Sequence, residues 1–157
     1  MILSVLACGC AGDDISRLSI MNDTGISIYA LPYASDFTDG DWIAPGTFVD
    51  FYSISHESLD AYAFFTLYYD SVIIYLEDHD LYPVKFYQDG STVNYDATRN
   101  PFTNPDVWDQ RKFKSYISGS PINSMEEKRI FEHFFAIERK YVKILSDSVL
   151  HELNPAP

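Results

Sequence analysis

Apolar and polar residues alternate along two short stretches near the start of the chain. Residues 17–21 and 26–30 each show the period-2 pattern of a strand with one buried face. Residues 22–25 between them, Asn-Asp-Thr-Gly, favour a turn, because Asn, Asp and Gly tolerate left-handed backbone. The pattern therefore predicts a β-hairpin over this part of the chain.

Four further stretches are rich in β-branched and aromatic residues and predict strands. They span residues 47–52, 72–76, 84–87 and 129–137. The stretch 72–76 is apolar throughout, which favours a central strand. Polar or turn-forming residues separate the predicted strands at 32–40, 44–46, 77–80 and 88–90.

Three segments remain outside this strand pattern. Residues 59–69 fit a helix by spacing, with Ser55 or Ser58 as N-cap, but consist of strand-forming residues; we predict a short helix there. Residues 94–120 contain several Pro and Asn, which predicts a long loop. The aromatic residues of this segment favour an ordered loop. A polar linker is predicted at 118–127. Residues 138–153 predict a C-terminal helix or pair of turns.

Together these elements predict a mainly β fold. Strands with few helices and turn residues at their ends indicate an antiparallel β-sandwich of the immunoglobulin or transthyretin type, with one or two short helices, one of them near the C-terminus. Aromatic residues make up 16% of the chain, which adds to the strand tendency. The 157 residues fit one domain, which we place at 16–157 after an N-terminal segment 1–15.

The charge balance narrows the classes of partner. The chain has 23 Asp and Glu against 11 Lys and Arg, a net charge of −12. Nucleic-acid binding requires a basic surface, so nucleic acid is not expected as a partner. The negative net charge of the domain as a whole is also expected to cause repulsion from anionic lipid headgroups. The apolar runs are all shorter than a membrane-spanning helix requires.

Cys8 and Cys10 are the two cysteines of the chain. This C-x-C pair does not supply the four ligands of a structural zinc site, and it is one residue too short for a C-x-x-C redox motif. The residues around Cys8 read Val5-Leu6-Ala7-Cys8, the apolar, apolar, small, cysteine order of a bacterial lipobox. A short apolar run before the cysteine is typical of the end of an export signal.

These features resemble the small uncharacterised cell-envelope lipoproteins of Bacteroidota. The resemblance rests on the lipobox, the acidic segment Asp13-Asp14, the motif Ile20-Met21-Asn22-Asp23-Thr24 and the aromatic-rich domain. It implies that Cys8 carries the lipid and anchors a compact β-sandwich to the outer membrane, surface-exposed or periplasmic. The apolar run is short and no Lys or Arg precedes it, as expected if the natural chain begins further upstream. The resemblance implies no catalytic residue.

The predicted loop holds the best candidates for ligand binding. Tyr95, Asp96, Asn100 and Trp108 combine rings that can stack on a sugar with side chains that can bind its hydroxyl groups. A glycan or a protein ligand would fit this chemistry. The alternative is that Trp108 and Phe102 fill one end of the sandwich core.

Other chemistry has weaker sequence support. The segment 36–41 offers hard oxygens for a structural calcium ion, although its spacing is not that of an EF-hand. His79 lies in an acidic turn whose neighbouring side chains would diverge, and we predict no metal site or other cofactor there. The sequence contains neither the H-E-x-x-H nor the G-x-S-x-G motif. We therefore expect a membrane-tethered binding or structural interaction module; the alternatives are a carboxylate-dependent hydrolase and a calcium-stabilised adhesion module.

Overall fold

The computed structural model describes most of the predicted domain. The described residues are 15–34, 37–38, 40–54, 60–77, 79–119 and 124–143. Cys8, the predicted C-terminal helix beyond residue 143, and parts of the predicted calcium segment lie outside these residues.

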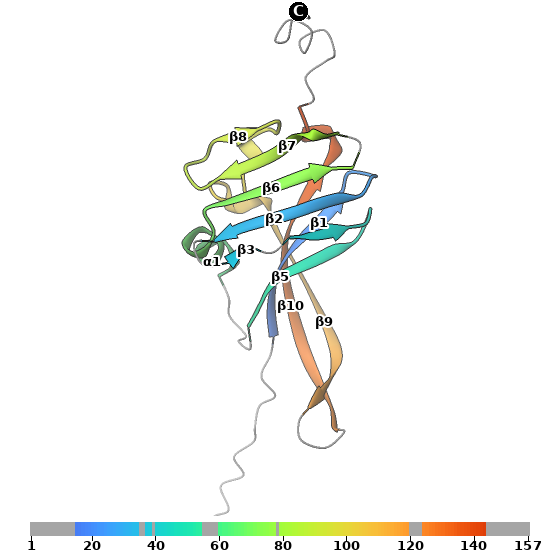
Figure 1. The fold of residues 1–157 in the computed structure, drawn as a ribbon. Coiled ribbons are helices and arrows are strands. Elements are labelled where there is room, and N and C mark those ends of the chain that lie inside the picture. Colours follow the sequence, from blue (N-terminus) through green and yellow to red (C-terminus); the bar gives the residue numbers. More distant parts are fainter. Residues whose placement is uncertain are drawn as a thin grey trace, which may run out of the picture.

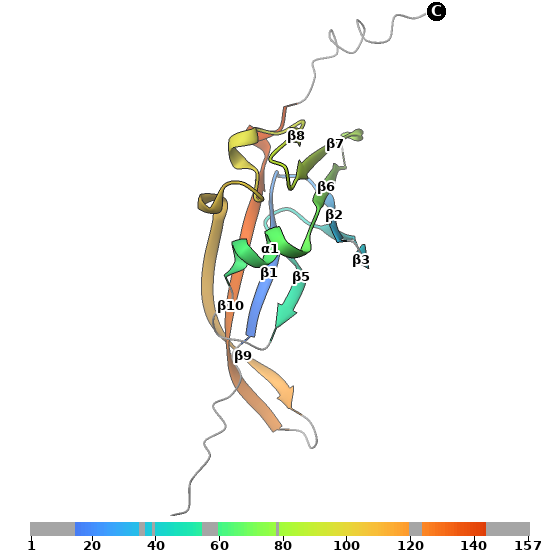
Figure 2. The same ribbon diagram turned by 90° about the vertical axis from the view of Figure 1, so that its left-hand side faces the viewer.

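The strands form two sheets that face each other (Figures 1 and 2). Sheet A has the order β5 (Phe48–Ile54), β1 (Ile15–Asp23), β10 (Ser124–Glu138), β9 (Trp108–Gly119). Sheet B has the order β3 (Phe37–Thr38), β2 (Ile28–Ala34), β6 (Ser71–Leu76), β7 (His79–Tyr87), β8 (Thr92–Val93), and β4 (Asp41–Ile43) also pairs with β2. The prediction of a mainly β, sandwich-like fold is confirmed.

Among the described residues, the strand pairs are antiparallel with one exception. β1 and β10 are parallel, with Ile15 opposite Ile130 and Asp23 opposite Glu138. Apolar side chains from both sheets fill the space between them, including Ile20, Ile74 and Phe86, each 0% exposed. Burial of such a core is the main stabilising contribution to the fold.

The predicted hairpin of residues 17–30 is wrong in its pairing, although both strands exist. β1 belongs to sheet A and β2 to sheet B, so the chain crosses between layers at residues 24–27. Buried Asn22 organises this crossing. Its Nδ2 donates to the carbonyl oxygens of Ile26 and Ile43, both at 2.7 Å, and its Oδ1 accepts from the backbone N–H and the hydroxyl of Thr24. These bonds provide hydrogen-bond partners for the polar groups of the turn, although the two strands do not pair as a β-hairpin.

The short helix is confirmed as α1 (Ala61–Tyr68), with a different cap from the predicted Ser55 or Ser58. The N-cap is Asp60, whose carboxylate accepts from the backbone N–H of Ala63 at 3.0 Å. The helix lies at one side of the space between the sheets (Figure 2) and buries Phe65 there. No helix among the described residues is long and apolar enough to cross a membrane.

The predicted long loop at 94–120 is correct for its first part only. Residues 97–99 and 105–107 form short 3₁₀ helices, η1 (Ala97–Arg99) and η2 (Pro105–Val107), and β9 begins at Trp108. The predicted linker at 118–127 is likewise reduced, because β9 reaches Gly119 and β10 begins at Ser124. The predicted loop at 32–40 also begins later, since β2 continues to Ala34. A third 3₁₀ turn, η3 (Arg139–Tyr141), follows β10.

Candidate functional site

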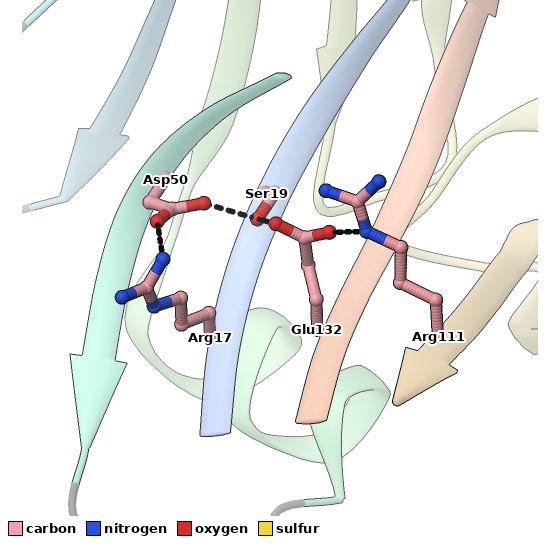
Figure 3. A network of polar contacts seen from close by, with 5 residues as sticks. All are labelled: Arg17, Ser19, Asp50, Arg111 and Glu132. Atoms are coloured by element: carbon pink, nitrogen blue, oxygen red, sulfur yellow. Dashed lines mark hydrogen bonds and ion pairs between the residues drawn. The ribbon is translucent and has the colours of Figure 1, made fainter. Parts of the chain in front are cut away.

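A chain of polar contacts crosses the outward face of sheet A (Figure 3). Arg17 Nη1 lies 2.9 Å from Asp50 Oδ2, and the Ser19 hydroxyl donates to Asp50 Oδ1 at 2.7 Å. The same hydroxyl oxygen lies 3.4 Å from Glu132 Oε1, and Glu132 Oε2 accepts from Arg111 Nε. The contacts therefore link β5, β1, β10 and β9 in order.

Each carboxylate of this network already has an arginine and the shared hydroxyl as neighbours. Glu132 is only 2% exposed, whereas the Arg111 side chain is about half exposed and its guanidinium carbon lies 3.9 Å from the centre of the Phe48 ring. A buried carboxylate that is already paired links neighbouring strands and is poorly placed to contact a substrate. The network therefore gives no support to the hydrolase alternative.

Two of the sequence-predicted ligand residues, Tyr95 and Asp96, lie beside the segment that follows β10. Tyr95 forms an isolated β-bridge with Val142, and the backbone N–H of Asp96 donates to the Tyr141 carbonyl oxygen at 3.1 Å. Tyr95 is 2% exposed, and its hydroxyl oxygen accepts from the backbone N–H of Glu138 at 3.1 Å. Burial raises the pKa of Tyr95 to about 12. The Asp96 carboxylate caps η1 by accepting from the backbone N–H and hydroxyl of Thr98, and these hydrogen bonds lower its pKa.

The other two, Asn100 and Trp108, hold the loop against the core. Asn100 is fully buried; its Nδ2 donates to the carbonyl oxygens of Tyr87 and Ser91, and its Oδ1 accepts from the backbone N–H of Phe102. The Trp108 indole donates to the Pro101 carbonyl at 3.0 Å. Its ring packs edge-on against Phe65 and Phe135, with centroids 5.0 and 5.1 Å away.

The four residues thus do not converge on one exposed surface. Tyr95 and Asn100 are buried, and Asp96 and Trp108 are partly exposed. The packing of Trp108 and the 3% exposure of Phe102 agree with the alternative that these rings close one end of the core. Ligand binding at this loop stays a prediction from sequence.

A different surface gathers aromatic side chains that are partly exposed, the outward face of sheet B. Residues directly opposite one another in the ladder share a face, so the register sorts these side chains into rows that run across the strands. The first row is Trp42, Tyr29 and Tyr75, on β4, β2 and β6. The second is Leu31, Ile73, Lys85 and Val93, and the third is Tyr33, Ser71 and Tyr87.

The first row is the most aromatic part of this face. The ring centroids of Tyr29 and Trp42 are 5.5 Å apart, and those of Tyr29 and Tyr75 are 6.4 Å apart. Trp42 is 58% exposed. Gly40 packs on this row, since a Cβ at that position would overlap the Tyr29 hydroxyl. Among the described side chains of the three rows, Lys85 is the one that carries a charge.

We define the sheet B face as these three rows. In an antiparallel sheet the solvent side normally carries polar residues, and large apolar surface on it indicates a binding site. The apolar run 72–76 has no alternation of apolar and polar residues, so its sequence does not indicate that one face of β6 is directed outward. The signal was available in the alternation of β2, where Tyr29, Leu31 and Tyr33 are large on the face opposite buried Ile28 and Ala30.

Metal ligands do not gather in the described part of the chain. No group of three or more His, Cys, Asp or Glu side chains that could hold a metal ion occurs among the described residues. The predicted calcium segment lies partly outside them, so calcium binding stays a prediction.

Comparison with known proteins identifies no relative. No protein-family model, no curated protein and no solved structure matches the chain.

Proposed function

We propose that this protein is a binding module of the bacterial cell envelope, tethered to the outer membrane by a lipid on Cys8, which holds a glycan on the sheet B face. The tether is supported by the lipobox Val5-Leu6-Ala7-Cys8 and the acidic segment after it. The binding role depends on one structural observation, the row of Trp42, Tyr29 and Tyr75 on a solvent-facing sheet.

The chemistry of the face favours a neutral, hydroxyl-rich partner. Tyrosine and tryptophan combine a broad apolar ring with a polar group, so they can contact the C–H side of a sugar and also bond its hydroxyl groups. Tyr29, Tyr33, Tyr75 and Tyr87 place four such hydroxyl-bearing side chains on the face. The net charge of −12 disfavours anionic partners, whereas a neutral glycan experiences no such repulsion.

The glycan site can be tested with a matched pair of variants. Trp42→Ala removes an aromatic side chain that is 58% exposed on the sheet B face, and Tyr68→Ala removes one that is 55% exposed on α1. The probes are four neutral oligosaccharides, cellohexaose, xylohexaose, mannohexaose and chitohexaose, titrated by calorimetry. We expect at least one to bind the wild type, Trp42→Ala to weaken binding by about tenfold or more, and Tyr68→Ala to leave it unchanged.

Two outcomes would contradict this assignment. Wild-type protein that binds none of the four sugars would exclude neutral glycans of these types, and equal effects of the two variants would remove the sheet B face as the site. The tether is tested separately, by mass spectrometry of the N-terminal peptide from the native host. An acylated Cys8 is expected, and an unmodified thiol would exclude the anchor.

A further inference from the structure

A cavity of about 260 Å³ lies between the two sheets, with β2 of sheet B on one side and β5 of sheet A on the other. Its walls include Ala30 and Pro32 of β2 and Val49 and Phe51 of β5. Ala30 belongs to the hydrophobic core, Pro32 is buried, and the two β5 side chains pack against the core. These walls are therefore apolar.

The cavity results from the order of side-chain sizes along β2. The outward positions of this strand carry Tyr29, Leu31 and Tyr33, whereas the inward positions 30 and 32 carry alanine and proline. The core of a sandwich is normally filled by interdigitating side chains from both sheets. Here the smaller side chains of β2 face Val49 and Phe51, so space is left between the two layers.

Asp41 of β4 places a carboxylate at this cavity. Asp41 lines the cavity and is directly opposite Ala30 in the β2–β4 pair. Residues directly opposite one another share one face of the sheet. Because Ala30 is 1% exposed and belongs to the core, the Asp41 side chain lies on the core-facing side of sheet B. Trp42, the next residue, is on the outward face, opposite Tyr29.

The charge of Asp41 is not balanced by a described residue. Asp41 Oδ1 accepts from the backbone N–H of Trp42 at 2.7 Å. The ion pairs among the described residues involve other carboxylates, and none of the described residues that line the cavity is basic. Asp50 also lines the cavity, but its carboxylate is paired with Arg17 and accepts from Ser19. The described lining thus combines apolar walls with the unpaired carboxylate of Asp41.

A small organic ammonium ion matches this combination. The ammonium group can donate to the carboxylate in a charge-assisted hydrogen bond, which is stronger than a neutral one. An apolar chain or ring attached to it would remove the surface of the cavity walls from water. The net charge of −12 favours the approach of a cation over that of an anion. Pockets for drug-sized ligands measure about 300–1,000 Å³, so the cavity suits a smaller molecule, such as an amine with one ring.

We infer that the cavity between β2 and β5 binds a small apolar ammonium compound, with the ammonium group on Asp41. This site lies on the core-facing side of sheet B, and the proposed glycan surface lies on the opposite side. The inference is independent of both the glycan and the lipid anchor, since it depends on the lining of the cavity alone.

Three probes of similar shape and different charge test the inference by calorimetry on the full chain at neutral pH. They are phenethylamine, phenethyl alcohol and hydrocinnamate, which are positive, neutral and negative. We expect the amine to bind about tenfold more tightly than the alcohol, and the anion to bind most weakly. Asp41→Asn should lower the affinity for the amine about tenfold and leave the alcohol within about twofold. Asp109→Asn, which removes the charge of an exposed aspartate on β9, is the matched control and should bind like wild type.

Ala30→Leu tests the space itself. The larger side chain fills part of the cavity, so the variant should melt at or above the wild-type temperature and lose affinity for the amine and the alcohol. A lower melting temperature or a failure to fold would show that the layers leave no room there, and would overturn the site.

The binding data can also overturn the inference. It fails if wild type does not bind phenethylamine, if the amine and the alcohol bind equally, or if Asp41→Asn and Asp109→Asn have the same effect. Trp42→Ala keeps the backbone N–H that bonds Asp41, so it should bind phenethylamine like wild type. Loss of the glycan site and loss of the ammonium site are therefore distinguishable.

Discussion

Glu132 on β10 forms an ion pair with Arg111 on the neighbouring strand β9, and only 2% of Glu132 is exposed. The other oxygen of Glu132 lies near Ser19, which bonds Asp50 on β5. A buried carboxylate depends strongly on its partner, because loss of the partner leaves an uncompensated charge. The pair therefore couples β9, the outer strand next to β10, to the centre of sheet A.

Arg111→Met should lower the free energy of unfolding by about 2 kcal/mol. This is below the usual cost for a fully buried pair, because the Arg111 side chain is about half exposed and water screens it. Urea denaturation gives the value. The double variant Arg111→Met/Glu132→Leu should lose less stability than the two single variants together, and additive losses would show that the two side chains are not coupled.

The crossing between the sheets predicts a second large effect. Asn22→Ala removes a partner of the Ile26 and Ile43 carbonyl oxygens and of the Thr24 N–H; the bonds to Ile43 and Thr24 are buried, and the bond to Ile26 is part-buried. We expect a loss of about 3 kcal/mol in unfolding free energy. Asn104→Ala is the matched control: Asn104 caps η2 by accepting from Asp106 N–H in an exposed position, so about 1 kcal/mol is expected there. Similar losses at both sites would mean that the buried crossing has no special role.

Local patterns predicted which segments form strands, and they could not predict which strands pair. The alternation at 17–21 and 26–30 identified β1 and β2, but their partners are set by contacts far along the chain, above all β1 with β10. The turn-like residues between them suited a hairpin, whereas in the structure β1 and β2 belong to different sheets and Asn22 bonds the carbonyl oxygens of Ile26 and Ile43 at the crossing.

The segment before β10 shows a second reason why the sequence did not predict the fold completely. Pro101, Asn104 and Pro105 correctly indicated irregular structure, but the prediction extended it over β9. β9 is a polar edge strand whose outward positions include Asp109 and Arg111, so its alternation is weak. Residues 59–69 were compatible with a helix or a strand. In the structure they contain the helix α1, which Asp60 caps and on which Phe65 is fully buried.

The candidate sites illustrate why composition alone misplaces function. Aromatic and amide residues at 95–108 suggested a binding loop, but Tyr95 and Asn100 are buried with their polar groups bonded to backbone. The sheet B face depends on the register between β2, β4 and β6, which brings Trp42, Tyr29 and Tyr75 into one row. Such register is not available from one sequence, although large residues on both faces of β2 are a usable signal.

Tyr95 predicts an alkaline transition in stability. Its pKa is about 12 in the folded protein, raised by burial, against about 10 when unfolded. A group whose pKa is raised on folding stabilises the protein fully below the unfolded pKa, and this contribution is lost as the pH rises from about 10 to about 12. A shift of this size corresponds to about 2–3 kcal/mol.

The variant Tyr95→Phe isolates that contribution. At neutral pH it should cost about 1 kcal/mol, because the Glu138 N–H loses its acceptor. Between pH 10 and 12 the stability of the variant should fall less than that of wild type, as measured by urea denaturation across that range. Parallel pH curves for the two proteins would contradict the assignment of the transition to Tyr95.

His133 predicts a second pH dependence, on the acid side. Burial lowers its pKa below the ordinary value, and the Asp60 charge opposes this shift. The unfolded chain therefore binds a proton at His133 more readily than the folded protein does. Its contribution to stability is complete above the unfolded pKa of about 6.5 and is lost as the pH falls below that value toward the folded pKa.

Two substitutions should change this slope in opposite directions. His133→Gln removes the titrating group, so the difference in unfolding free energy between pH 8 and pH 5 should become smaller than in wild type. Asp60→Asn keeps a good N-cap for α1 but removes the charge that favours protonated His133, so the same difference should become larger. Urea denaturation at both pH values measures each slope. If His133→Gln retains the wild-type slope, another group controls the acid dependence of stability.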